Sequence, residues 1–208
     1  MGRAATSRRS TFYKVRCFMK VVAFNGSPRA NGNTAQAIKF VFEELEKEGI
    51  QTEMINIGGK KIVGCINCGK CRTNKDRKCA VKDDDMNMYI EKMIEADGII
   101  IGSPVYYGNV TAAIKALIER CGQVTRVNDE LLARKTGAAV VSVRRAGSNF
   151  TYAAINFFFG IMQMTVPGSS YWNMTLSRDP GEIQKDEEGI KTFRTLGKNM
   201  AWIIKKTA

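Results

Sequence analysis

Four cysteines lie close together in one short stretch of the chain, and their spacing suggests chemistry. They are Cys65, Cys68, Cys71 and Cys79, in the pattern C-x2-C-x2-C-x7-C. Four neighbouring thiolates can hold an iron-sulfur cluster or a zinc ion, or they can stay free as redox-active thiols. The x7 gap is longer than the C-x3-C of bacterial ferredoxin runs, and Ala80 stands where those runs carry proline. The spacing therefore leaves all three alternatives open.

Basic residues surround these cysteines and lead us to expect thiolates. Positive charge near a thiol lowers its pKa. The basic residues are Lys70, Arg72, Lys75, Arg77 and Lys78. The acidic run that follows, at residues 83–85, is interpreted as the cap of the next helix, where negative charge is favourable.

The chain has no histidine, and this removes whole classes of catalytic site. Ser-His and Cys-His nucleophile pairs are excluded, as are zinc and non-haem iron sites with imidazole ligands. Two further cysteines, Cys17 and Cys121, are isolated and are interpreted as inert. Because we see no secretory signal, we interpret the clustered four as metal-binding or redox thiols rather than as a disulfide framework.

A second candidate site follows the first predicted strand. Residues 25–34 form a loop rich in Gly, Ser and Asn that opens directly into a predicted helix. The backbone N–H groups of a helix N-terminus, together with the helix dipole, bind phosphate. The side chains that can add hydrogen bonds or charge are Ser27, Arg29, Asn33 and Thr34. An ordinary capped helix after a turn is the structural alternative for this segment.

Two common nucleotide-binding patterns are not satisfied by the sequence. The dinucleotide fingerprint G-x-G-x-x-G does not occur. Residues 64–71 imitate a Walker A loop, but Cys71 stands where Mg²⁺ requires the hydroxyl of Ser or Thr. ATP or GTP hydrolysis is therefore not expected.

The hydrophobic pattern alternates between strand and helix along the chain from Lys20. The predicted strands are 21–24, 52–57, 98–101, 138–143 and a fifth within 165–174, and the predicted helices are 34–48, 86–95, 110–120, 150–162 and 190–205. This alternation predicts an α/β fold with a parallel sheet and helices on both faces. Ligands of such sheets bind beyond the carboxyl ends of the strands, so the loops after the first, third and fourth strands should form the site.

Length and charge set further limits on the class of protein. At 208 residues the chain fits one domain, taken as 19–208, after a basic extension at 1–18 that we expect to be disordered. The net charge is +12, but the basic residues outside that extension are spread along the chain, so nucleic-acid binding is not expected. No apolar stretch is long enough to span a bilayer, so we expect no membrane association and a cytoplasmic location.

The loops after three of the predicted strands resemble those of one known family. Residues 25–34 are similar to the phosphate loop of flavodoxin-like NAD(P)H-dependent FMN reductases. Residues 103–109, Ser-Pro-Val-Tyr-Tyr-Gly-Asn, resemble that family's flavin-ring loop, and residues 142–147 resemble its loop after the fourth strand. Within the family, the cysteine stretch resembles that of the iron-sulfur flavoproteins, which bind a [4Fe-4S] cluster near FMN. The similarity spans about residues 19–205.

This resemblance implies a fold and a set of site residues. The fold is a flavodoxin-like, doubly wound, five-stranded parallel sheet of order 2-1-3-4-5, with the cysteine-rich loop inserted after the second strand. The implied FMN ligands are Ser27, Arg29, Asn33 and Thr34 at the phosphate, Ser103, Pro104, Val105, Tyr106, Tyr107, Gly108 and Asn109 along the ring, and Ser142, Arg144 and Gly147 on its other side. The implied cluster ligands are Cys65, Cys68, Cys71 and Cys79. Plain loop packing for the two tyrosines and a solvated pair at residues 144–145 are the structural alternatives.

The resulting hypothesis is an FMN-dependent oxidoreductase without a protein catalytic residue, because the flavin carries the chemistry. Electrons would enter from NAD(P)H as co-substrate or from a reduced ferredoxin-like donor, pass through FMN and the expected [4Fe-4S] cluster, and reach a quinone or another small acceptor. A homodimer or homotetramer is implied, and the apolar helix around residues 157–159 suggests a subunit interface or core burial. Two other classes stay open: an electron carrier that acts only through a protein partner, and a binding domain without catalysis.

Overall fold

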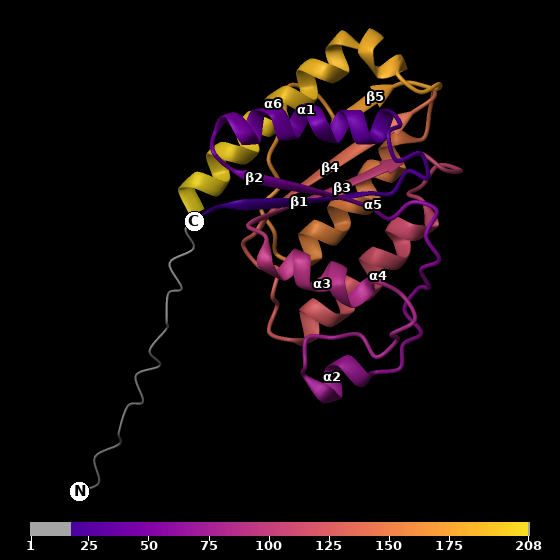
Figure 1. Cartoon of the computed structure of the whole chain (residues 1–208), viewed down its shortest axis with the longest axis vertical. Helices are drawn as coiled ribbons and strands as arrows, with labels where there is room; N and C mark the ends of the chain where they lie inside the picture. Colours follow the sequence, from indigo (N-terminus) through magenta and orange to yellow (C-terminus); the bar gives the residue numbers. More distant parts are fainter. Residues whose placement is uncertain (1–17, 208) are drawn as a thin grey trace, which may run out of the picture.

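A computed structural model describes residues 18–207 of the chain (Figure 1). A parallel five-stranded sheet lies at its centre, in the order β2-β1-β3-β4-β5. The strands are β1 (Lys20–Asn25), β2 (Gln51–Asn56), β3 (Gly98–Pro104), β4 (Thr136–Val143) and β5 (Met174–Leu176). The predicted fold class and strand order are confirmed. The expected disorder at residues 1–18 falls almost wholly outside the described range.

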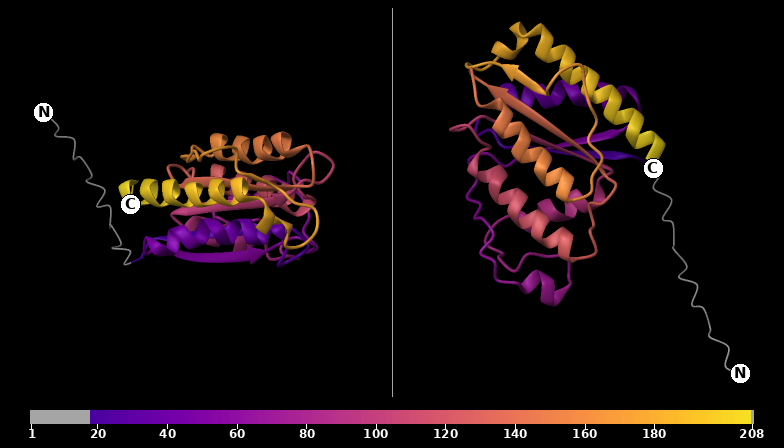
Figure 2. Two further views of the ribbon diagram at one scale, coloured as in Figure 1. Left: turned by 90° about the horizontal axis from the view of Figure 1, so that it is seen from above. Right: turned by 180° about the vertical axis from the view of Figure 1, so that it is seen from behind.

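Helices cover both faces of the sheet, as the two views of Figure 2 show. The pair α1 and α6 packs on one face, and α3, α4 and α5 pack on the other. Their bounds are α1 (Asn33–Lys47), α3 (Met86–Glu95), α4 (Ala112–Val127), α5 (Ser148–Ile161) and α6 (Glu187–Thr207), with a short α2 (Lys70–Asn74) and a 3-10 turn η1 (Glu182–Lys185). None of the helices between residues 18 and 207 has the length and apolar content that crossing a membrane requires.

Alternation of side chains along the inner strands builds the two halves of the core. In β1, Val22 and Phe24 pack against the α3, α4 and α5 side, whereas Val21 and Ala23 pack against α1 and α6. All of β4 and nearly all of β3 are buried, as expected for strands covered on both faces. Because they are buried on both faces, the inner strands are continuous apolar runs that can be recognised in the sequence.

The fifth strand is shorter and later than predicted. The prediction placed it within 165–174, but β5 runs over Met174–Leu176. The preceding segment contacts β4 at two points only, where the N–H of Gly137 donates to the oxygen of Thr165 and the N–H of Val141 donates to the oxygen of Asn173. Between those points the chain leaves the sheet, because Pro, Gly and two Ser residues at 167–170 favour a loop.

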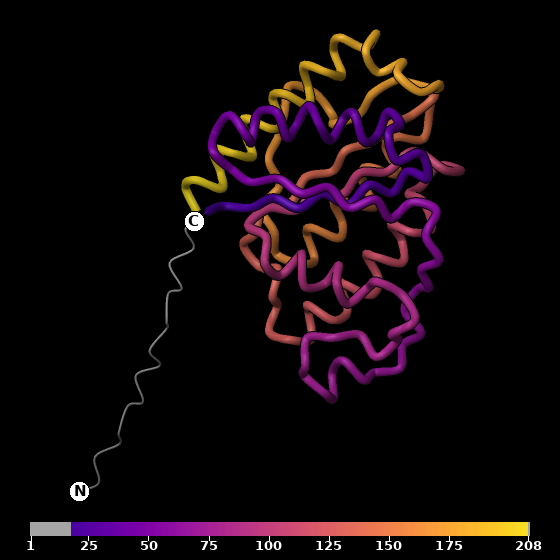
Figure 3. The backbone as a smooth tube through the Cα atoms, in the orientation of Figure 1, coloured from indigo at the N-terminus to yellow at the C-terminus, as the bar shows by residue number. Residues whose placement is uncertain are grey.

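The cysteine loop, defined as residues 64–80, projects from the side of the molecule that carries α3 and α4 (Figure 3). After β2 the chain runs past α4 to the short α2 and then returns to α3. Helix α2 was not predicted, since five residues are too few to give a periodic signal. Helix α4 extends to Val127, beyond the predicted end at residue 120, and this extension supports the loop.

Candidate functional site

A cavity of about 260 Å³ opens at the carboxyl ends of β1, β3, β4 and β5. We call it the sheet-end cavity. It lies at the edge of the sheet where doubly wound folds bind ligands. Its walls are Ser27, Arg29, Gly32, Asn33, Thr34, Pro104, Val105, Tyr106, Ser142, Arg144, Ser177 and Arg178. The structure thus brings residues from all three predicted loops together and adds the loop after β5.

One end of the sheet-end cavity is built to hold an anion. Gly32 is the N-cap of α1, and no side chain caps the helix, so N–H groups of its first turn stay available. Three arginines from separate loops, Arg29, Arg144 and Arg178, add positive charge around it. The Ser27 hydroxyl accepts the N–H of Arg29 at 3.2 Å and so shapes the loop. These features fit a phosphate group.

Asn33 lies in the wall, and its side chain also links two loops. Its Nδ2 donates to the oxygen of Asp179 at 2.9 Å, and its Oδ1 accepts the N–H of Gly181 at 2.9 Å. Arg29 also donates from Nη1 to the oxygen of Arg178 at 3.5 Å. Asn33 therefore holds the loop after β5 against the phosphate loop and also lines the cavity, so its direct contact with a phosphate stays a prediction.

Two buried serines that line the cavity have hydroxyls without a partner. Ser142 Oγ and Ser177 Oγ are buried, and neither forms a hydrogen bond among the described residues. A buried hydroxyl without a partner costs about 1–3 kcal/mol, so native proteins seldom leave one unless a ligand satisfies it. Ser177 and Arg178 were not found from the sequence, because the fifth strand was placed too early.

The ring loop makes a tight turn beside the cavity. Tyr106 and Asn109 exchange two backbone hydrogen bonds of 2.9 and 3.0 Å across the turn. Tyr107 and Gly108 between them have φ of 50° and 76°, which is the type I′ pattern. Of these four residues only Tyr106 lines the cavity, and Tyr107 is fully exposed. Gly108 and Asn109 therefore shape the loop instead of lining the cavity.

Close approach of two loops requires a glycine at position 147. Gly147 has φ of 91°, and a Cβ there would lie 3.0 Å from Val105 and 3.1 Å from the backbone of Gly108. Gly147 thus joins the loop after β4 to the ring loop without lining the cavity. Glycine is required here because any side chain would push the two loops apart.

Ser103 is also a linking residue and does not line the cavity. It is fully buried, and its hydroxyl donates to the oxygen of Pro104 at 2.8 Å and accepts the N–H of Thr111 at 3.1 Å. Thr111 in turn donates from Oγ1 to the oxygen of Gly26 at 3.0 Å. This chain connects the ring loop to the phosphate loop through the start of α4.

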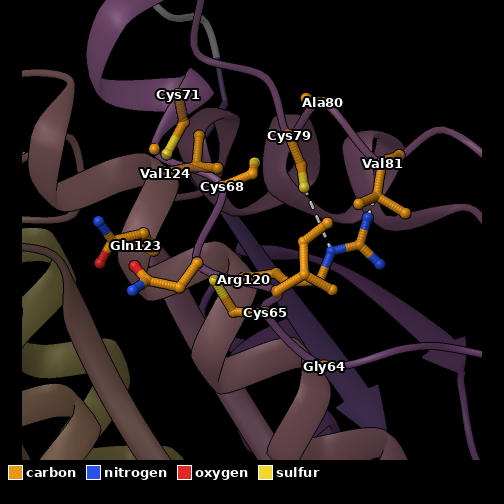
Figure 4. A pocket seen from close by; sticks show the side chains of 13 residues that line it. Gly64, Cys65, Cys68, Cys71, Cys79, Ala80, Val81, Arg120, Gln123 and Val124 are labelled. Carbon is orange, nitrogen blue, oxygen red and sulfur yellow. Dashed lines mark hydrogen bonds between the residues drawn. The ribbon is translucent and has the colours of Figure 1, made fainter.

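All four clustered cysteines line a second, smaller cavity of about 20 Å³, the cysteine cavity (Figure 4). Cys71 is buried and Cys79 half-buried, whereas Cys65 and Cys68 are exposed. Figure 4 shows the four side chains arranged around one opening next to residues of α4. The structure therefore brings together the thiols that the sequence singled out.

Side chains from α3 and α4 fix the backbone of the outer cysteines. Asn87 Oδ1 accepts the N–H of Cys79 at 2.7 Å, and its Nδ2 donates to the oxygen of the same residue at 3.0 Å. Glu119 Oε2 accepts the N–H of Cys65 at 3.2 Å. The first and last thiols are thus placed by two helices that belong to the main core.

Burial raises the pKa of the Cys71 thiol, and the nearby Cys65 and Cys68 raise it further. The expectation that the basic residues would lower the thiol pKa is therefore wrong for Cys71. Those basic side chains are exposed, where water and salt screen their charge, so desolvation dominates. Asn128 donates from Nδ2 to the Cys71 oxygen at 3.3 Å and holds this cysteine in place.

Arg120 of α4 joins both ends of the cysteine loop. Its side chain is 1% exposed. Nε donates to Cys79 Sγ at 3.3 Å, Nη1 to the oxygen of Val63 at 3.2 Å and Nη2 to the oxygen of Val81 at 2.9 Å. Nη1 also forms an ion pair with the buried carboxylate of Asp84. Asp84 also accepts the N–H of Met86 at the start of α3, as the predicted cap requires, so the ion pair adds a second role to the cap.

A signal for Arg120 was present in the sequence. It lies on the apolar face of α4, at helical spacing with the buried Leu117, Cys121 and Val124. A charged residue on a buried stripe is expected to be paired inside the protein.

The four thiols line one cavity but are not arranged around a single ion. No three Cys, Asp or Glu side chains within residues 18–207 lie close enough together to hold one metal ion, as tetrahedral zinc requires. In a four-iron cluster each thiolate binds a different iron, so the sulfurs are farther apart. The cavity has room for about one water, so the cysteine loop would have to open for a cluster to bind.

Comparison with known proteins gives a consistent family. The NADPH-dependent FMN reductase family matches residues 19–179. The chain is 37% identical over 193 residues to an iron-sulfur flavoprotein of Methanocaldococcus jannaschii, with 90% of this chain and 98% of the relative covered. It is 34% identical over 188 residues to an iron-sulfur flavoprotein of Methanosarcina thermophila, with 89% and 95% covered.

Solved structures share the fold at low sequence identity. An NADH:FMN oxidoreductase superposes with a TM-score of 0.61 at 16% identity, covering 91% of this chain and 90% of the other. A flavodoxin from the domain Archaea superposes with a TM-score of 0.58 at 16% identity, covering 90% and 99%. Both establish the flavodoxin-like architecture.

Proposed function

The chain belongs to the NADPH-dependent FMN reductase family, within its iron-sulfur flavoprotein branch, and we propose that it moves electrons from NAD(P)H or a reduced ferredoxin-like donor to a quinone or another small acceptor. When bound, FMN supplies the hydride and single-electron chemistry. The residues of the chain bind and orient the cofactor. The single observation that carries the proposal is the pair of unpartnered hydroxyls, Ser142 and Ser177, in a cavity that three arginines also line.

The sheet-end cavity suits FMN in both charge and polarity. The open N-terminus of α1 and the guanidinium of Arg29 would hold the phosphate. Ser142 and Ser177 would bond polar atoms of the cofactor, and Tyr106 would cover an apolar surface. Ser103 and Gly147 would keep the surrounding loops in register.

A [4Fe-4S] cluster on Cys65, Cys68, Cys71 and Cys79 is the second part of the proposal. Its support is the shared cavity of the four thiols and the similarity of the chain to iron-sulfur flavoproteins. A cluster exchanges single electrons, whereas a nicotinamide delivers a hydride. A protein holding both FMN and a cluster could therefore accept electrons from a one-electron donor or from a hydride donor.

The proposed partners include a second copy of the chain. Phe158 and Phe159 of α5 are buried, but Phe150, Phe157 and Ile161 are exposed, so this helix serves the core and also presents an apolar surface. We propose that the surface contributes to a homodimer or homotetramer. Absence of nucleic acid and membrane partners, and a cytoplasmic location, stay predictions.

The proposal is tested on protein purified without oxygen, by its visible spectrum together with iron, acid-labile sulfide and flavin assays. We expect about one FMN and about four irons per chain, and reduction by NAD(P)H or by a reduced ferredoxin. The variant Cys68→Ser should lose the iron and keep FMN, while Cys121→Ala, at a buried cysteine outside the loop, should keep both.

Three other results would replace the proposal. Flavin without iron would identify a plain FMN reductase with structural thiols. Reduction that needs a protein partner and never occurs with NAD(P)H alone would identify an electron carrier. Purification without flavin, combined with no FMN binding on titration, would identify a non-catalytic domain.

A further inference from the structure

We propose that Arg120 is the positioning residue of the cysteine loop. It holds the metal-free loop in the shape that brings the four cysteines together, and it donates a hydrogen bond to the sulfur of the last one. The second half of this inference rests on the proposed cluster. The first half concerns the protein without metal. Arg120 does not line the sheet-end cavity.

The first step is geometric. The carbonyl oxygens of Val63 and Val81 lie on either side of the cysteine loop, and both accept hydrogen bonds from the same guanidinium. One side chain therefore closes the whole loop on itself. Residues 65–78 are mostly exposed and have few apolar contacts of their own, so this closure replaces the hydrophobic packing that the loop lacks.

The second step concerns charge. Arg120 is fully buried, and its positive charge is balanced by Asp84, whose side chain is 5% exposed. Asp84 is itself held, since its Oδ1 accepts the N–H of Met86 at 3.1 Å at the start of α3. Removing either partner of such a pair leaves the other as a buried, unbalanced charge. The pair thus fixes the direction of the guanidinium relative to two helices.

The third step is the contact with sulfur. Nε of Arg120 donates to Cys79 Sγ at 3.3 Å, as the dashed line in Figure 4 shows. Hydrogen bonds to ligand sulfurs and nearby positive charge both favour the reduced form of an iron-sulfur cluster, which carries more negative charge. Lysine cannot reproduce the contact, because its compact ammonium lacks the planar fork that reaches four groups at once.

The variants that test the inference are Arg120→Lys, Arg120→Gln and Asp84→Asn. Lysine keeps the charge and glutamine removes it. Asparagine at position 84 keeps the shape and the acceptor of the Met86 N–H and is the variant to use if the arginine variants fail to fold. The matched controls are Arg126→Lys and Arg126→Gln, at an exposed arginine of the same helix.

The first readout is hydrogen exchange of the metal-free, FMN-bound chain. In Arg120→Lys we expect amides of residues 64–80 to exchange at least about tenfold faster, a change equal to the loss of about one net hydrogen bond. Asp84→Asn should show a smaller increase in the same segment. The β3 and β4 amides and the affinity for FMN should stay as in the wild type, and the position 126 variants should change nothing.

The second readout is the reduction potential of the iron-loaded chain. The potential should fall from wild type to Arg120→Lys to Arg120→Gln, with the last variant shifting the reduced-to-oxidised ratio at a fixed potential by about tenfold. A purely structural role would lower the iron content and leave the potential of the loaded fraction unchanged.

Specific results would overturn the inference. Unchanged exchange of residues 64–80 in the position 120 and 84 variants would contradict the positioning role, as would faster exchange that spreads equally through the sheet. An unchanged potential would contradict the contact with sulfur. Wild-type protein that never holds iron would contradict the proposed cluster but not the positioning role, because the exchange measurement needs no metal.

Discussion

Three buried serines near the sheet-end cavity differ in one respect that can be measured. Ser142 and Ser177 have hydroxyls without a protein partner, whereas the hydroxyl of Ser103 makes two internal hydrogen bonds. This difference separates serines whose hydroxyls are available to a ligand from a serine whose hydroxyl stabilises the fold.

Replacing the unpartnered hydroxyls should change ligand binding and spare the protein itself. We expect Ser142→Ala and Ser177→Ala each to weaken FMN binding by about tenfold, or about 1.4 kcal/mol. Without FMN, both variants should be as stable as the wild type or slightly more stable, since a buried unsatisfied group is removed. Fluorescence titration with FMN and thermal unfolding of the FMN-free chain measure the two effects.

Ser103→Ala is the matched control. It should lower the free energy of unfolding by about 1–2 kcal/mol, because the N–H of Thr111 and the oxygen of Pro104 lose their partner. If instead Ser142→Ala destabilised the FMN-free chain and left FMN affinity intact, the distinction between ligand-binding and structural serines would be contradicted.

Single residues were predictable from the sequence where local pattern placed them. The phosphate loop and the cysteines stand out because their types and spacing are local signals. Arg120 and Ser177 were missed because their roles arise from contacts with segments distant in sequence, such as the 57 residues that separate Arg120 from Val63. The apolar stripe of α4 indicates that Arg120 is paired inside the protein, but no local pattern identifies its distant partners.

At the scale of elements, the loop after β2 packs directly on the phosphate loop through a glycine. A Cβ at Gly58 would lie 2.1 Å from the carbonyl carbon of Ser27 and 2.5 Å from the oxygen of Gly26. Backbone atoms on both sides cannot swing away as a flexible side chain can. The contact sets how closely these two loops approach.

Gly58→Ala should therefore damage both the fold and the site. We expect it to lower the free energy of unfolding by about 3 kcal/mol or more, and to abolish measurable FMN binding, because the phosphate loop must shift. Chemical denaturation and FMN titration check the outcome. Gly160→Ala is the control: a Cβ there meets nothing within 4 Å, so this exposed position in α5 should gain about 0.5–1 kcal/mol.

A fully stable Gly58→Ala variant with normal FMN affinity would mean that the two loops do not touch as described.

The elements themselves were predicted well where burial is continuous, as in β1, β3 and β4. Prediction failed at β5 and α2, which are short and depend on neighbours: β5 pairs with β4 over only three residues, and α2 is one turn within the cysteine loop.

Across the whole molecule, Glu53 connects three elements by charge. It lies on β2 and pairs with Lys20 of β1 at 2.5 Å and with Lys92 of α3 at 2.8 Å. The hydrogen bond with Lys20, followed by that with Lys92, holds the pKa of the Glu53 carboxyl below its ordinary value of 4.5. The folded state thus favours the ionised form more than the unfolded state does.

This shift gives a signed dependence of stability on pH. A carboxyl whose pKa is depressed by folding stabilises the protein above its unfolded pKa, and the contribution disappears as the pH falls through the folded value. Glu53→Gln should lower the free energy of unfolding by about 1 kcal/mol at pH 7, and the gap from wild type should close near pH 3. Urea midpoints at the two pH values measure it. A gap of equal size at both would contradict the pairing.

The hydrogen bonds of Arg120 also bear on how freely the length of the cysteine loop can vary. Its two ends are held at Val63 and Val81 by one guanidinium, whatever number of residues lies between them. Lengthening a closed loop is inexpensive, since each doubling adds only about 0.6 kcal/mol of closure entropy. Insertions and deletions in the x7 gap before Cys79, beyond the end of α2, would therefore leave the sheet and the helices packed on it unchanged. The segment that looked least regular in the sequence is the one whose length the fold constrains least.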